Sequence, residues 1–136
     1  MTAPFRIAAT AAALAMIVGS ATAAPIKAWS AMAGVEPAAL LVAAQEMPLS
    51  AVAVDDQPYC ASDAEIAATL GHDFAERLID STGHDGHVAE LWGSDLMGTW
   101  TLVAARPDNT SCIIASGIGY DDSTAHDAFY RTAGLI

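Results

Sequence analysis

Apolar residues in the second half of the chain recur with two different periods. From Ser62 to Asp80 they return every four residues, which is the spacing of one face of a helix. From His87 to Ser116 they alternate with polar residues in short runs, which is typical of strands with one buried face. The pattern predicts an α+β fold in which one main helix packs on a three-stranded antiparallel sheet.

The predicted helix has recognisable signals at both ends. Ser62 followed three residues later by Glu65 is a capping box, which satisfies amide groups at a helix start. Gly83 suits the left-handed position that often follows a helix. Between these signals runs a single apolar stripe, which we expect to pack on the sheet. The stripe consists of Ile66, Leu70, Phe74 and Leu78.

Three strands are expected after the helix, and the turn between the last two sets their register. The strands are His87–Trp92, Thr99–Ala105 and Thr110–Ser116. A three-residue turn at positions 107–109 places Ala104 opposite Cys112, and it places Leu102 opposite Ile114. A four-residue turn would move the cysteine to the threonine face. The face that we expect the helix to cover carries Trp100, Leu102, Ala104, Cys112 and Ile114.

The first 23 residues have the organisation of a secretory signal. One arginine precedes a short apolar run, Ile7–Val18, and small residues ending at Ala23 follow it. The run is shorter than the roughly 20 residues that span a bilayer. We therefore expect cleavage after Ala23, a periplasmic or secreted protein, and no stable membrane anchor afterwards.

Residues 24–59 contain four prolines and few large apolar side chains. Only Pro37–Met47 could form a short helix, with its proline in the first turn. We expect this segment to be a flexible linker or a loosely docked arm, and the alternative is a segment that orders on a partner. The predicted domains are thus the signal (1–23), the arm (24–59) and a small disulfide-stapled domain (60–136).

Cys60 and Cys112 are the only cysteines, and an even number in an exported chain favours a disulfide. Their spacing is unlike that of a redox C-x-x-C pair. The chain is also strongly acidic, with 16 Asp and Glu against 5 Lys and Arg, for a net charge of −11. Such a surface repels phosphate backbones, which argues against nucleic acid and favours a cationic protein or peptide partner.

Two groups of residues are candidates for function. His84 and His87 flank an Asp-Gly pair and could ligate a metal, with His72 as a third ligand. Trp92, Ser94 and Asp95 lie at a strand end and could form a contact surface, because aromatic residues are enriched at binding hot spots. No catalytic set or cofactor motif is evident, and the alternation around Trp100 predicts a core position.

The segment from Glu90 to Gly117 resembles small exported proteins of uncharacterised function from proteobacteria. These share an E-[LV]-[WF]-x-S-x-x-x-G-T-W-T run followed by a cysteine and A-S-G. The resemblance implies an exported, disulfide-bonded module and no particular activity. The matching positions are Glu90, Leu91, Trp92, Ser94, Gly98, Thr99, Trp100, Thr101, Cys112, Ala115, Ser116 and Gly117.

These observations predict a non-enzymatic exported module, without a cofactor, that binds a protein, a peptide or an envelope component. The alternative is an exported metal-binding protein that uses the loop of His84 and His87.

Overall fold

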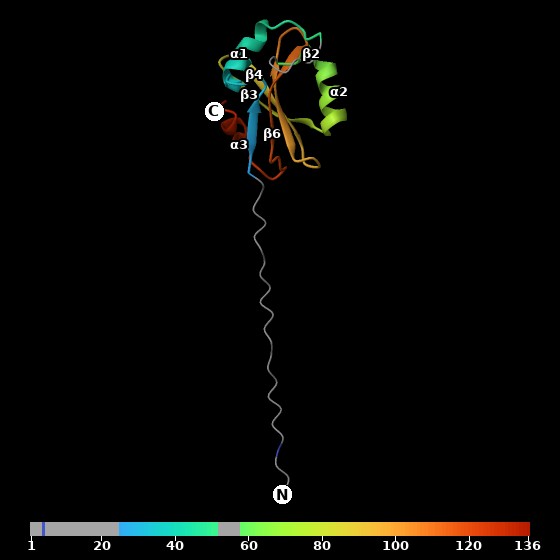
Figure 1. The fold of residues 1–136 in the computed structure, drawn as a ribbon, viewed down its shortest axis with the longest axis vertical. Helices are drawn as coiled ribbons and strands as arrows, with labels where there is room; N and C mark the ends of the chain where they lie inside the picture. The colour runs from blue at the N-terminus through green and yellow to red at the C-terminus, as the bar shows by residue number, and fades with distance from the viewer. Residues whose placement is uncertain (1–3, 5–24, 52–57) are drawn as a thin grey trace.

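The computed structural model describes residue 4 and residues 25–51 and 58–136. Apart from Pro4, the predicted signal peptide lies outside the described residues. The described chain forms one antiparallel sheet with helices on both faces (Figure 1). The expectation of one main helix on a three-stranded sheet is therefore wrong.

The sheet has six strands and the order β1-β6-β5-β4-β3, with β2 paired to β6 beside β1. The strands are β1 (Lys27–Ser30), β2 (Cys60–Ser62), β3 (Arg77–His84), β4 (His87–Ser94), β5 (Thr99–Ala105) and β6 (Thr110–Ile118). The helices are α1 (Pro37–Ala43), the short 3-10 turn η1 (Ala44–Glu46), α2 (Asp63–Phe74) and α3 (His126–Thr132).

The helix predicted to run to Asp80 ends at Phe74 instead. Ser62 caps its start, since the Ser62 hydroxyl accepts a hydrogen bond from the Glu65 amide at 3.2 Å. Ala75 then takes a left-handed conformation with φ of 52° and ends the helix. Gly83, the expected helix stop, lies inside β3. Leu78, the last residue of the predicted apolar stripe, also belongs to β3 and not to the helix.

The two faces of the sheet are covered by different helices. Figure 1 shows α1 and α3 on one side, which we call the inner face, and α2 on the other, the outer face. The five residues predicted to share a face all lie in the inner core. The helix expected to cover them packs elsewhere, because Ile66 and Leu70 contact Val103 on the outer face. Burial from both sides explains why β5 is almost wholly buried.

Residues 25–51 of the predicted N-terminal arm contribute a strand and a helix to the fold, which corrects the expectation that the arm is disordered or loosely docked. Strand β1 pairs with β6, with Trp29 opposite Ser116. Helix α1 buries Leu40 and Leu41 against the inner face. These two leucines are adjacent in sequence, and both are at most 1 % exposed. Both pack in the cluster that also contains residues of the sheet and of α3.

The predicted register of β5 and β6 is correct at the turn and wrong beyond it. Ala104 pairs with Cys112, and Asn109 in the three-residue turn has a φ of 60°. A bulge between Leu102 and Val103 then shifts the pairing, so that Leu102 faces Ala115 instead of Ile114.

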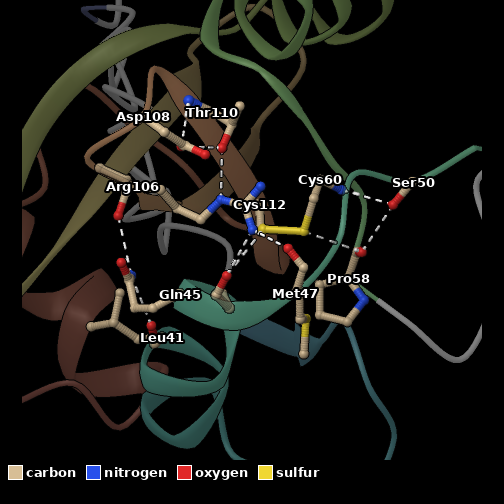
Figure 2. The surroundings of a disulfide bond; sticks show 12 residues. Leu41, Gln45, Met47, Ser50, Pro58, Cys60, Arg106, Asp108, Thr110 and Cys112 are labelled. Atoms are coloured by element: carbon tan, nitrogen blue, oxygen red, sulfur yellow. Dashed lines mark hydrogen bonds between the residues drawn. A yellow bond between two sulfur atoms is a disulfide. The ribbon is translucent and has the colours of Figure 1, made fainter.

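The predicted disulfide is confirmed. Cys60 of β2 and Cys112 of β6 are direct cross-strand partners with Cα atoms 4.0 Å apart, and both are fully buried (Figure 2). The bond ties the segment just before α2 to β6.

Arg106 ties η1 to the hairpin beside this bond (Figure 2). Its Nε donates to Thr110 Oγ1 at 2.7 Å, and its Nη1 donates to the carbonyls of Ala44, at 3.0 Å, and Met47. Gln45 adds a bond from Nε2 to the Ala105 carbonyl at 3.2 Å. The N-terminal segment is thus held by polar contacts as well as by its leucines.

Candidate functional site

A row of side chains crosses the outer face from one edge of the sheet to the other. The register aligns one residue from each of five strands, so that their side chains point the same way. In strand order, the row consists of Trp29, Ser116, Thr101, Trp92 and Leu78. Helix α2 covers only part of this face, and Trp29 and Leu78 are 53 % and 49 % exposed.

A cavity of about 340 Å³ lies where α2 ends over this row, and we call it the Glu76 pocket. Its walls are mainly apolar, and its size is near the lower end of the range for small-ligand sites. Phe74 and Ile118 are 44 % and 43 % exposed. The residues that line it include Trp29, Phe74, Glu76, Thr99, Ser116 and Ile118.

The end of α2 brings Glu76 into this pocket. Because Ala75 is left-handed, the chain reverses there, and the Glu76 amide donates back to the Leu70 carbonyl at 3.0 Å. Arg77 then begins β3. Glu76 is consequently held between the helix and the sheet and is only 4 % exposed. Sequence reasoning missed it because it occupies an apparently helical position.

The wall of the pocket holds a buried carboxylate and a buried hydroxyl. Neither Glu76 Oε2 nor Thr99 Oγ1 has a hydrogen-bond partner among the described residues. Burial raises the pKa of Glu76, and the nearby hydroxyls of Thr101 and Thr99 offset this only in part. The two hydroxyls thus lower the pKa of the carboxyl. Even so, Oε2 itself has no hydrogen-bond partner among the described residues. An unsatisfied buried carboxylate is costly, so the site favours a group that supplies hydrogen bonds.

The raised pKa gives a testable dependence of stability on pH. The folded protein holds the Glu76 proton more tightly than the unfolded chain does. The resulting stabilisation is complete below the ordinary pKa of 4.5 and is lost as pH rises through the folded pKa. We therefore expect Glu76→Gln to raise the melting temperature by about 4 °C at neutral pH, because it removes a buried charge worth about 1 kcal/mol. Thermal denaturation followed by circular dichroism measures this.

The same comparison at pH 4 provides the control, because Glu76 of the unchanged protein is then largely protonated in both the folded and the unfolded state, and the difference between the two proteins shrinks. Asp73→Asn, which removes a half-exposed carboxylate from the same helix, should leave the melting temperature nearly unchanged at both pH values. A Glu76→Gln effect of equal size at pH 4 and pH 7 would contradict the assignment.

The predicted histidine pair lies far along β3 from this pocket, at a hairpin. His84 and His87 are cross-strand partners on either side of Asp85-Gly86, whose φ values are 50° and 77°. His72 lies on α2 and contacts Asp73 at 2.9 Å. Within the described residues, no group of three or more His, Cys, Asp or Glu side chains is placed to hold a metal ion. The metal site stays a prediction that the geometry does not strengthen.

The predicted contact surface is divided by the structure. Trp92 lies on the outer face, in the same row as Trp29, and packs beside α2. Ser94 is 2 % exposed, and its hydroxyl accepts the Met97 amide at 3.0 Å inside the turn. Asp95 accepts a bond from the Asp122 amide at 3.4 Å. Trp92 and Ser94 therefore share the outer face with the Glu76 pocket, since Ser94 is paired directly with Thr99, but Ser94 is buried and bonded within the turn.

A comparison with models of protein families, a search of curated proteins and a search of solved structures each found no match. The resemblance to small exported proteins accordingly stays a prediction. In the part of the chain that the structure describes, no helix has the length and apolar character needed to cross a membrane.

Proposed function

We propose that this protein is an exported, non-enzymatic module that binds a protein or peptide through the Glu76 pocket. The observation that carries the proposal is a mainly apolar cavity of about 340 Å³ with an unsatisfied, buried carboxylate oxygen in its wall. An apolar pocket with few polar groups is the usual form of a binding site. The binding role needs no chemical step at this carboxyl.

The surface around the pocket supports a macromolecular partner. Trp29, Phe74 and Ile118 are each more than 40 % exposed and line the same opening. Exposed apolar groups gathered around a cavity are typical of interaction sites, and tryptophan is enriched at binding hot spots. The acidic net charge of −11 favours a cationic partner.

Export is supported by the buried Cys60–Cys112 disulfide and by the signal-like pattern of residues 1–23. Disulfides persist mainly in oxidising compartments, which include the periplasm and the extracellular space. The proposal therefore places the partner in the envelope or outside the cell.

The test uses pentapeptides of the form Gly-Gly-X-Gly-Gly with norleucine, phenylalanine or lysine at X. They are titrated into ¹⁵N-labelled protein, and amide shifts are followed by NMR. We expect at least one peptide to shift the amides of Phe74, Thr99 and Ile118. The expected Kd is about 1 mM, because a single side chain gains little beyond the cost of association.

A variant that fills the pocket provides the matched control. Ser116 is exposed and lines the cavity, so Ser116→Trp should occlude it and abolish these shifts. Ser81→Trp makes the same change at an exposed position of β3 outside the pocket and should preserve them. The proposal fails if no peptide shifts the pocket amides, or if Ser116→Trp binds as well as the unchanged protein.

A further inference from the structure

We propose that the side chain bound in the Glu76 pocket is a lysine of the partner, with its ammonium against Glu76 and Thr99 and its methylenes against Trp29 and Phe74. This inference rests on the proposed function and names the chemistry of its ligand. The argument depends on the buried acceptors, on the apolar walls and on the charge of the protein.

The polar groups in the pocket wall are a carboxylate, which is an acceptor only when ionised, and threonine hydroxyls. Glu76 Oε2 and Thr99 Oγ1 have no hydrogen-bond partner within the described residues, and Thr101 lies beside the same carboxyl. An ammonium carries three donors and no acceptor, so it can satisfy several such oxygens at once. A carboxylate or carbonyl from a ligand would add a further acceptor beside a carboxylate oxygen that already lacks a donor.

The remainder of the pocket suits the lysine stem. Its four methylenes are apolar and cover apolar surface while the charged end seeks a polar partner. Trp29 and Phe74 supply aromatic surface at the opening, where a cation or its adjacent methylenes are also attracted to the ring face. Arginine fits less well, because its planar group spreads five donors around a larger polar head.

Charge favours the same ligand. A lone buried carboxylate is costly, whereas one paired with a hydrogen-bonding cation is compensated. Only 5 Lys and Arg accompany 16 Asp and Glu in the chain. Neither Lys27 nor Arg77, which follows Glu76 and contacts Asp122 at 3.4 Å, lines the pocket, so we assign the cation for Glu76 to the partner.

The experiment measures Kd by NMR titration for Gly-Gly-X-Gly-Gly peptides with lysine, norleucine, Nε-acetyl-lysine or arginine at X. Titrations are made at 150 mM salt, which screens attraction to the distant surface charges beyond about 8 Å. We expect the lysine peptide to bind at least about tenfold more tightly than the norleucine and acetyl-lysine peptides. Glu76→Gln should reduce that preference to within about twofold, whereas Asp73→Asn, which removes an equal charge from the surface, should keep it.

Each other outcome overturns the inference in a recognisable way. Equal or tighter binding of the norleucine peptide leaves the proposed function standing and removes lysine as its ligand. Tighter binding of the acetyl-lysine peptide shows that Glu76 is protonated and donates to the ligand. Tighter binding of the arginine peptide assigns the site to a guanidinium. A lysine preference retained in Glu76→Gln shows that the general surface charge, and not Glu76, is responsible for it. If no peptide binds, both this inference and the proposed function are overturned.

Discussion

Removing the Cys60–Cys112 disulfide by replacing both cysteines with alanine is expected to lower the free energy of unfolding by about 4 kcal/mol. The bond closes a loop between residues 52 positions apart, and in the chain-entropy model a loop of this length restricts the unfolded chain by that amount. Such a loss is a large fraction of the whole free energy of unfolding of a small domain. Because both cysteines are fully buried in the inner core, the alanines also lose packing. Urea denaturation followed by tryptophan fluorescence measures the change.

Reduction supplies the matched control for this variant. A reducing agent with mild denaturant should destabilise the unchanged protein by a similar amount and should not affect the double-alanine variant. A loss of less than about 1 kcal/mol would contradict the view that this bond supplies a large share of the stability.

Gly117→Ala is expected to destabilise the fold by about 3 kcal/mol, which is large for one added methyl group. Gly117 lies between β1 and β5, opposite Ala28 and Trp100. A Cβ there would overlap both the Trp100 indole and the Lys27 carbonyl. The indole cannot easily move, because its Nε1 donates to the Ile118 carbonyl at 3.0 Å and its ring packs on Phe129.

Gly83→Ala is the control for this second prediction. Gly83 is also a strand glycine, but a Cβ there meets only the His87 carbonyl, at an ordinary 3.9 Å. We expect its effect to stay within about 0.5 kcal/mol. Chemical denaturation of the two variants under the same conditions compares them, and equal effects would show that the space around Trp100 does not constrain residue 117.

The sequence predicted side-chain alternation better than it predicted how the layers are assembled. Trp100, Leu102 and Ala104 do share a buried face, because the two-residue period of a strand is geometric. The same period cannot show which helix covers that face. Val103 and Ile113 make the opposite face apolar as well, and α2 packs there.

The sequence pattern placed the end of α2 too late, and the reason is local. A left-handed residue at a helix end is usually glycine, but here it is Ala75. The apolar spacing also continues through Leu78, as it would if the helix continued. Asp85-Gly86 was the available signal. An Asp-Gly pair with positive φ at both residues is typical of a two-residue hairpin turn, which requires a strand before it as well as after it.

The pocket could not be predicted because its parts come from distant segments. Trp29 comes from the expected arm, and Glu76 from the apparent helix, while Thr99 and Ser116 lie on the expected sheet. A four-residue strand such as β1 is too short to give a distinctive pattern. The burial of Glu76 depends on contacts that arise only after α2 and the sheet pack together. Of the predicted contact residues, Trp92 and Ser94 lie on this face, and of these two Ser94 is buried.

The most direct test of the proposed site is the position of the bound lysine. An isotope-filtered NOE experiment on labelled protein with the Gly-Gly-Lys-Gly-Gly peptide reports which protons lie near the lysine ε-methylene. Our account predicts NOEs to the Thr99 methyl group and to the Phe74 ring. NOEs confined to the exposed turn residues Leu96 and Met97 would contradict it and would place the contact outside the Glu76 pocket.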